Sequence, residues 1–378
     1  MQGISVTSVS PPPGRLGGLD TLRGLAAVAV LLCHVAAYWA FMDLPGKLPQ
    51  LFDLMAQGVD IFIVISGFVL FYPVLRSGGH LDARQFFGRR TFRILPAYYV
   101  GLAIAAALAL NPSTARYVVA EPANWGQVLI HVLGVQTWFP GSLGSINGSL
   151  WSVSLELHLY LVFPPLVLAW RRWGIVPVLV VSAILALVWN LMAGGPSYGD
   201  YGLAVGGGHA LPARFVQFVA GMACAYWVVR RGVPPLRGSV VLATASVLAA
   251  VTASSTDQSA PIRHLAWAAA GVGLVLLTSS LARSREYPPM TERFGERAYS
   301  FYLLHQPIVL LLAPLAGRLD GWVTQLVIGS IGAFTLTSIA AALMYRWVEL
   351  PTHRLGRRLF PRPSRTATGA GPVPFPSD

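Results

Sequence analysis

The sequence predicts an all-α integral membrane protein with about ten transmembrane helices, and three observations support this. Of the 378 residues, 54% are hydrophobic and only 11% are charged, whereas a soluble protein usually carries about 25% charged residues. The apolar residues fall into runs long enough to cross a bilayer, whose hydrocarbon core takes about 20 helical residues. The arginines collect in alternate connecting segments, as they do in multi-pass membrane proteins.

The hydrophobic runs define ten expected spans and one shorter stretch. The spans are expected at residues 19–41, 58–75, 93–110, 149–169, 175–193, 210–229, 238–253, 263–281, 299–317 and 322–346. Residues 125–139 are also apolar, but the run is short and polar residues interrupt it, so it predicts a re-entrant or interfacial segment.

The arginine pattern gives the orientation of these spans. With the N-terminus in the cytoplasm, the outer segments hold only Lys47, Arg116, Arg263 and Arg318. The remaining loop arginines all fall on the cytoplasmic side, as the positive-inside rule requires. The arginine pattern therefore predicts a multi-pass protein with both termini in the cytoplasm. Enrichment in Arg, Ala, Gly and Pro is typical of a GC-rich bacterial genome, so the expected location is the bacterial inner membrane.

Composition also bounds the domain organisation and the partners. Residues 1–18 are rich in Pro and Gly and lack the apolar core of a signal peptide, so they predict a disordered tail. Residues 19–350 form the expected membrane domain and residues 351–378 a cytoplasmic tail.

The net charge of +12 does not indicate nucleic-acid binding, because the charges lie in short loops between spans. Two cysteines, Cys33 and Cys224, lie within apolar spans, which excludes a disulfide framework and a thiolate metal site.

The first span carries the most informative pair of residues. Arg23 and His34 are eleven residues apart, so they share one face of a helix and lie about 16 Å apart along its axis. An ionisable residue at such depth is costly and marks a functional site by default. Asp20 lies within one turn of Arg23 and is expected to brace its guanidinium. An ion pair that only holds helices together is the structural alternative.

Further polar residues lie in the second, fourth and ninth spans. Asp60 stands at the outer end of the second span, with Ser66 near its middle. Glu156, in the fourth span, is at about the depth of His34 and is expected to orient it or to stabilise its cationic form, with Tyr160 as a supporting residue. His305, in the ninth span, is as readily a packing residue as a site residue.

The segment that leads into the third span contains Arg89, Arg90 and Arg93. Arg90 and Arg93 lie one helical turn apart and can hold a phosphate between them. Topology alone also concentrates arginines in cytoplasmic loops, so the spacing by itself leaves both interpretations open.

Taken together, these segments resemble the membrane-bound acyltransferase-3 family of bacterial O-acyltransferases, whose acceptors include polysaccharides and macrolide-type natural products. The matching segments are LDTLRGLAAVAVLLCHV, GVDIFIVISGFVL, FFGRRTFRILPAYYV, SLWSVSLELHLYLVFP and AYSFYLLHQPIV, in the order of the family and over residues 19 to 346. Two motifs depart from the family pattern. Glu156 is followed by Leu157 where members often have Gln or Glu, and His305 stands in Leu-His-Gln-Pro where they often have Trp-His-Trp-Pro.

The resemblance implies a ten-helix fold that takes an acyl-CoA donor from the cytoplasm. His34 matches the essential histidine of the family, Arg23 its arginine and Glu156 its acid. Arg90 and Arg93 match the paired arginines that are thought to hold the nucleotide end of CoA, and Arg89 adjoins them. No permanently bound cofactor and no metal are expected, and acetyl is the commonest acyl group in the family.

The resulting expectation is direct acyl transfer, with neutral His34 as the general base for the acceptor hydroxyl. A covalent acyl-histidine intermediate is the less favoured route. The acceptor is either a sugar hydroxyl of an envelope glycan or a hydroxyl of a small natural product such as a macrolide. The absence of an extracellular domain after the tenth span slightly favours the natural-product acceptor. Association between copies of the chain is left open.

A proton-coupled transporter or exporter that uses the same buried charges is the alternative function.

Overall fold

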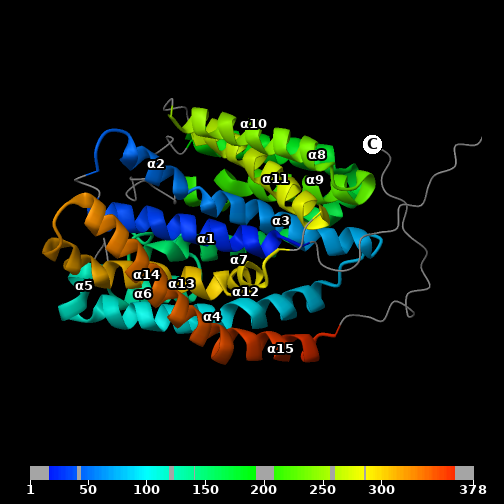
Figure 1. The fold of residues 1–378 in the computed structure, drawn as a ribbon. Helices are drawn as coiled ribbons and strands as arrows, with labels where there is room; N and C mark the ends of the chain where they lie inside the picture. The colour runs from blue at the N-terminus through cyan, green and yellow to red at the C-terminus, as the bar shows by residue number, and fades with distance from the viewer. Residues whose placement is uncertain are drawn as a thin grey trace, which may run out of the picture.

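The computed structural model describes residues 17–40, 44–118, 123–139, 141–192, 208–255, 260–284 and 287–361. The regular elements of this part of the chain are all helical (Figure 1). Ten of the helical segments are long and apolar enough to cross a membrane: Leu19–Trp39, Leu48–Arg76, Ala83–Leu110, Gly148–Trp173, Ile175–Met192, Leu211–Arg231, Leu236–Ser255, Ile262–Ser284, Ala298–Arg318 and Trp322–Leu359. The predicted all-α membrane fold with ten spans is confirmed.

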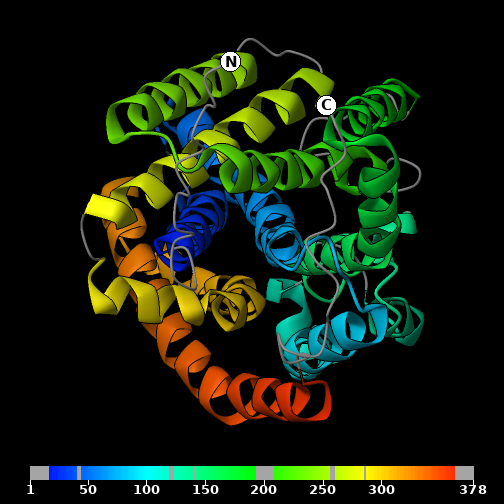
Figure 2. The same cartoon turned by 90° about the vertical axis from the view of Figure 1, so that its right-hand side faces the viewer.

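The principal helices follow the expected order along the chain. They are α1 (Leu19–Val35), α3 (Gly58–Arg76), α4 (Ala83–Leu110), α7 (Trp151–Trp173), α8 (Ile175–Met192), α9 (Leu211–Arg231), α10 (Leu236–Ser255), α11 (Ala260–Ser284), α13 (Ala298–Leu312) and α14 (Trp322–Met344). Shorter helices join them, namely α2 (Leu48–Met55), α5 (Pro112–Val118), α6 (Trp125–Val132), α12 (Pro289–Glu296) and α15 (Leu350–Leu359). Seen from one end, the helices surround a central region (Figure 2).

Helix α4 begins ten residues before the expected start of its span at residue 93. The carboxylate of Asp82 caps the helix by accepting a hydrogen bond of 3.0 Å from the backbone N–H of Gln85. This cap satisfies a donor that the helix itself cannot satisfy, so the helix starts in the polar segment. As a result Arg89, Arg90 and Arg93 lie on the same rigid helix as the membrane span.

The short apolar stretch at residues 125–139 does not cross the bundle. It forms α6 and then a single 3₁₀ turn, Gln136–Trp138, whose residues Gln136 and Thr137 are buried. The segment continues to the 3₁₀ turn Gly148–Leu150, which leads directly into α7. Irregular backbone is tolerated in a membrane protein where other helices cover it. This buried connection brings polar side chains into the interior.

The C-terminal part of the chain is helical beyond the last span. A π-helical turn, Tyr345–Glu349, joins α14 to α15, and α15 lies beside α4 (Figures 1 and 2). The expected C-terminal tail, residues 351–378, therefore starts as an ordered helix. Residues 362–378, like residues 1–16 of the expected N-terminal tail, lie outside the described residues.

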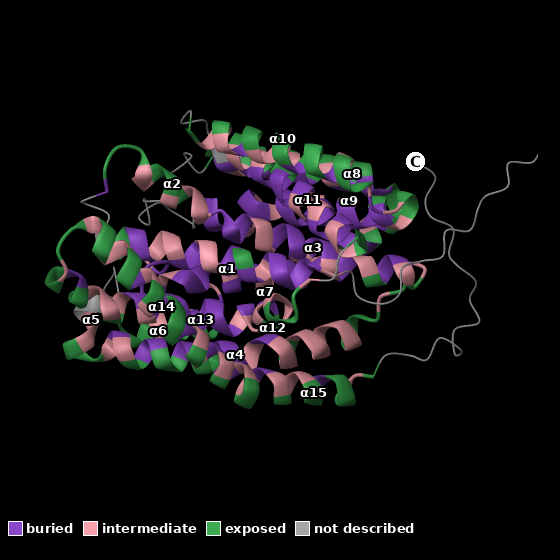
Figure 3. Ribbon diagram, viewed as in Figure 1, coloured by how far each residue is buried: buried purple, intermediate pink, exposed green. Residues whose placement is uncertain are grey.

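The pattern of buried and exposed side chains agrees with a helix bundle that spans a membrane (Figure 3). Large apolar side chains are buried on the central helices α1, α3 and α9, whereas Leu191, Val241 and Ile331 on the outer helices are more than half exposed. In a membrane protein such outward apolar side chains face lipid instead of water. The polar residues of the interior are the exceptions that mark the site described below.

Two glycines allow α3 and α9 to touch along their backbones. A Cβ at Gly67 would collide with the carbonyl oxygen of Phe218, and one at Gly221 with the carbonyl oxygen of Val64. Small residues permit such close approach between membrane helices. Of these two helices, α3 also lines the cavity described below.

We expect Gly67→Ala to lower the thermal stability of the detergent-solubilised protein. The added methyl group meets backbone and not a flexible side chain, and overpacking of this kind costs about 1–3 kcal/mol. Gly332→Ala is the matched control, because nothing lies within 4 Å of a Cβ at that helical glycine. An equal melting temperature for the two variants, measured by size exclusion after heating, would contradict the close contact of α3 and α9.

Candidate functional site

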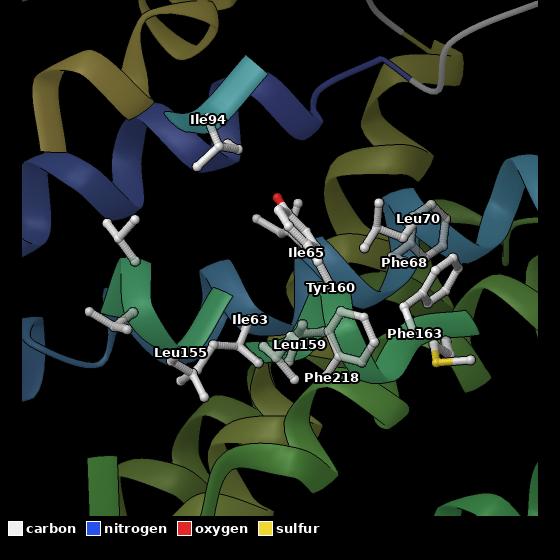
Figure 4. Packing of buried hydrophobic residues seen from close by; sticks show 14 of the residues in the cluster. Ile63, Ile65, Phe68, Leu70, Ile94, Leu155, Leu159, Tyr160, Phe163 and Phe218 are labelled. Carbon is white, nitrogen blue, oxygen red and sulfur yellow. The ribbon is translucent and has the colours of Figure 1, made fainter. Parts of the chain in front are cut away.

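A cavity of about 100 Å³ lies between α1, α3, α4, α7, α12 and α13. Apolar side chains such as Ile63, Ile94 and Leu159 form part of its wall, and Figure 4 shows the Tyr160 ring extending from α7 toward α4, where Ile94 lies. The polar side chains that line it are Arg23, Ser66, Arg90, Arg93, Ser152, Glu156, Tyr160, Glu296, Tyr299 and Tyr302. An apolar cavity with a few convergent polar groups is typical of a small-molecule site.

Three of the predicted arginines meet in this cavity although they come from two distant helices. Arg23 on α1 forms the predicted ion pair with Asp20, with 2.9 Å between the guanidinium nitrogen and the carboxylate oxygen. Arg90 and Arg93, one turn apart on α4, line the same cavity. The structure thus brings together the phosphate-binding candidates that the sequence placed on separate spans.

Glu156 belongs to this arginine end of the cavity. The hydroxyl of Tyr160, one turn further along α7, donates a hydrogen bond to the Glu156 carboxylate. The guanidinium of Arg90 lies over the Tyr160 ring, 5.5 Å from its centroid, in a cation–π contact. Glu156 and Tyr160 therefore hold Arg90 in place and offset part of the positive charge.

Arg89 points away from the cavity. Its Nε donates a hydrogen bond of 2.6 Å to the carbonyl oxygen of Phe360, at the end of α15. One residue of difference turns a side chain by 100° around a helix, so Arg89 and Arg90 necessarily face different neighbours. The expectation that Arg89 lies with the other two at the same anion site is not met.

His34 lies next to His305 and not next to Glu156. The ring centroids of His34 and His305 are 5.1 Å apart in an edge-on arrangement, and the Tyr38 ring stacks on His34 at 5.8 Å. The carboxylate of Glu156, which was expected to orient His34, accepts a hydrogen bond from Tyr160 and lines the cavity with the arginines, so its action on His34 stays a prediction. The structure places His305 against His34, and its role at the site stays a prediction.

His305 is fully buried and is held by its backbone neighbour. Its Nδ1 lies 2.6 Å from the carbonyl oxygen of Tyr302, and a carbonyl oxygen only accepts, so Nδ1 carries the hydrogen. In the neutral ring, Nε2 is then an acceptor, and it lies 3.4 Å from the hydroxyl of Ser149. These contacts fix both the tautomer and the orientation of the ring beside His34.

Gln306 links the same hydroxyl back to the first helix. The single hydrogen of the Ser149 hydroxyl can be donated either to His305 Nε2 or to the Gln306 amide oxygen, and the Gln306 amide nitrogen donates to the hydroxyl of Tyr38 at 3.3 Å. His34, Tyr38, Gln306, Ser149 and His305 thus form a closed cycle of contacts, which we call the histidine cycle. Its members come from α1 with its π-helical continuation (Ala36–Ala40), the 3₁₀ turn before α7, and α13.

Tyr302 connects the histidine cycle to the cavity. Its ring lines the cavity and lies 5.0 Å from the His305 ring, and its hydroxyl accepts a hydrogen bond of 2.8 Å from Ser152. The sequence analysis missed Tyr302 and Ser152, although a signal was present. Each lies one helical turn before a predicted site residue, His305 and Glu156, and so shares a face with it.

The two predicted residues of α3 have different surroundings. Ser66 lines the cavity. Asp60 is fully buried outside it, paired with the guanidinium of Arg214 and hydrogen-bonded at 2.6 Å to the amide of Gln217. A buried ion pair of this kind joins α3 to α9.

The described residues contain no group of three or more His, Cys, Asp or Glu side chains that could hold a metal ion.

Comparison with known proteins places this arrangement in a family. The family model described as acyltransferase domain matches residues 16–345. Acyltransferase MdmB of Streptomyces mycarofaciens is 30% identical, in an alignment that covers 93% of this chain and 95% of the relative. Nodulation protein 10 of Rhizobium leguminosarum bv. viciae is 27% identical over 92% of this chain and 97% of the relative. No solved structure matches the chain.

A third relative is longer than this chain. Peptidoglycan O-acetyltransferase OatA of Listeria monocytogenes is 24% identical over 89% of this chain but over only 56% of its own length. The match lies across the membrane bundle that holds the cavity and the histidine cycle. With ten spans and a family match over most of its length, the chain belongs to the acyltransferase-3 family and is a multi-pass membrane O-acyltransferase.

Proposed function

We propose that this protein transfers an acyl group, acetyl in the first instance, from acyl-CoA to a hydroxyl of a sugar or of a macrolide-like natural product. The observation that carries the proposal is one cavity with Arg23, Arg90 and Arg93 at one end and Tyr302, in contact with His305, in its wall. It pairs a site for anions with a site for proton transfer. Acyl-CoA needs both, because its phosphates and its thioester lie at opposite ends of the molecule.

The arginines fit the nucleotide end of this donor. Arg90 and Arg93 offer planar, always charged donors that match phosphate oxygens, and Arg23 adds a third from α1. Arg23 and His34 share one face of α1 and are about 16 Å apart along it. This separation is on the scale of an extended pantetheine arm, so one donor molecule can reach both residues.

His34 supplies the proton transfer. In its neutral form the imidazole takes the proton of the acceptor hydroxyl as the oxygen attacks the thioester carbonyl carbon. The carbon–sulfur bond then breaks, the ester forms, and the proton passes from His34 to the departing CoA thiolate. The reaction is balanced without a permanently bound cofactor or a metal, and no covalent acyl-histidine is required.

His305 acts in this proposal as a positioning residue for His34. Its Nδ1 is committed to the Tyr302 carbonyl, so its ring cannot turn without losing a buried hydrogen bond. The edge-on contact then restricts the orientation of the His34 ring. Such fixed orientation is what a general base needs to meet its proton at hydrogen-bonding distance.

The orientation in the membrane follows from the arginine pattern. We place the arginine end of the cavity and both termini at the cytoplasmic face of the bacterial inner membrane, where acyl-CoA is available. The acceptor is then a hydroxyl that reaches His34 through the bundle.

The direct test is an acyl-transfer assay with purified protein and radiolabelled acetyl-CoA. We expect release of free CoA that depends on an added hydroxyl acceptor, with the label recovered in an ester. A panel of macrolides and envelope oligosaccharides separates the two acceptor classes. Absence of CoA binding by the wild-type protein would contradict the proposed donor.

A further inference from the structure

The C-terminal helix α15 adds a second basic surface beside the arginines of α4. Gly356 of α15 packs against Phe92, where a Cβ would lie 2.6 Å from the Phe92 Cβ, and the Phe360 ring lies over Gly88. Arg89 donates to the Phe360 carbonyl oxygen at 2.6 Å, and Gln85 donates to the carbonyl oxygen of Pro361. The two helices are thus joined by ring packing and by hydrogen bonds, which fixes their relative position.

The face of α15 that packs on α4 also carries two basic side chains. His353 and Arg357 are four residues apart and, with Gly356 and Phe360, share this face of the helix. His353 is half-buried and Arg357 is exposed. Arg89, Arg90, Arg93 and Arg357 lie near enough to His353 to act on it electrostatically. We call His353 and Arg357 the α15 pair.

Arg93 is the junction between the α15 pair and the cavity. On α4 it lies 40° around the helix from Arg89, which faces α15, and 60° from Arg90, which faces the cavity. It accordingly lines the cavity and also lies near His353. Arg93 therefore links the cavity arginines to the edge of α15.

The arginines gathered in this way repel one another and favour a bound anion, and the His353 ring among them adds an N–H donor. Glu349, in the turn before α15, is buried and accepts a hydrogen bond of 2.7 Å from Ser300. A single pyrophosphate in the cavity would meet Arg23, Arg90 and Arg93 but would leave the α15 pair without an anion. The surface fits a ligand that has a second, separate phosphate group.

We propose that the α15 pair binds the ribose 3′-phosphate of the donor CoA, while the cavity arginines bind its pyrophosphate. The proposal rests on the proposed CoA donor and adds a specificity: the enzyme distinguishes CoA from 3′-dephospho-CoA. The helix after the last span is then part of the donor site. Arg357 reaches the phosphate from solvent, and half-buried His353 approaches it from the side of Arg93.

The test is isothermal titration of the purified full chain with CoA and with 3′-dephospho-CoA, which needs no acceptor. We expect the wild type to bind CoA about tenfold more tightly, as charge-assisted contacts at an exposed edge allow. The double variant His353→Gln with Arg357→Gln should bring this ratio close to one, with the affinity for 3′-dephospho-CoA unchanged. Arg357→Lys, which keeps the charge, should retain part of the preference.

Arg358→Gln is the matched control, because Arg358 is exposed and lies 100° further around the same helix than Arg357. It should leave the ratio at the wild-type value. Equal affinity of the wild type for both ligands would overturn the 3′-phosphate site and leave the CoA donor intact. A double variant that weakens both ligands equally would also overturn it. Failure of the wild type to bind either ligand would overturn the CoA donor and this site together.

Discussion

His34→Gln is expected to abolish acyl transfer while the protein still binds CoA. General-base catalysis contributes about 10²–10⁴-fold to a rate, and Gln cannot take up the proton of the acceptor. In this proposal the donor phosphates contact other residues, since Arg23, Arg90 and Arg93 line the cavity, whereas the histidine pair lies outside the cavity lining. The measurement is kcat for acetyl transfer together with the Kd of CoA by titration calorimetry.

The matched control for this variant is His80→Gln, since His80 is exposed in the connection between α3 and α4. It should keep full activity. A His34→Gln enzyme with more than about a tenth of wild-type kcat would rule out His34 as the base. A concurrent loss of CoA affinity would show instead that the variant disturbs the whole bundle.

Replacing both Arg90 and Arg93 by Ala is expected to raise the KM for acetyl-CoA by about 10²–10⁴-fold. Each lost charge-assisted hydrogen bond costs about 1.5–3 kcal/mol, and every 1.4 kcal/mol is a factor of ten in affinity. Because the arginines contact the non-reacting end of the donor, saturating acetyl-CoA should restore much of kcat. Initial rates over a wide range of acetyl-CoA concentration separate the two constants.

Arg171→Ala with Arg172→Ala is the matched control for the arginine pair. It removes the same charge from the last turn of α7, where both side chains are exposed and outside the cavity lining. We expect its KM to stay near the wild-type value. An equal rise of KM in the two double variants would indicate a general loss of positive surface charge and would contradict a specific phosphate site.

The sequence was sufficient to predict which parts of the chain cross the membrane. Composition and run length are local properties, and they identified all ten spans, although α4 started earlier because Asp82 caps it. The i, i+3 and i, i+4 relations were equally local, so the Asp20–Arg23 pair was predicted correctly. Features that depend only on positions within a single helix could therefore be predicted from the sequence.

The partner of His34 was not accessible, because helical periodicity gives depth and face but not which helix stands opposite. Glu156 and His34 have similar depth in the sequence, yet α7 turns Glu156 toward Tyr160 and Arg90. The position beside His34 goes to His305 on α13. The burial of the turn at Ser149 could not be predicted either, because irregular backbone has no hydrophobic periodicity that would indicate which residues are buried.

Family membership decides between the two functions that the buried charges alone left open. Ten helices with intramembrane charges suit a proton-coupled transporter as well as an enzyme. The acyltransferase domain match over residues 16–345 supports the enzyme. In the proposed function the arginines, Glu156 and Tyr160 serve substrate binding and form no proton pathway across the membrane.

The histidine cycle makes the reactive geometry a property of the assembled bundle. Helix α1, the turn at Ser149 and helix α13 are far apart in the chain, and each supplies at least one link of the closed ring. The cycle closes only when all three segments have docked against one another. Under the proposed function, a nascent or partly inserted chain would therefore lack the arrangement that orients His34, and activity would begin only with complete insertion of the bundle.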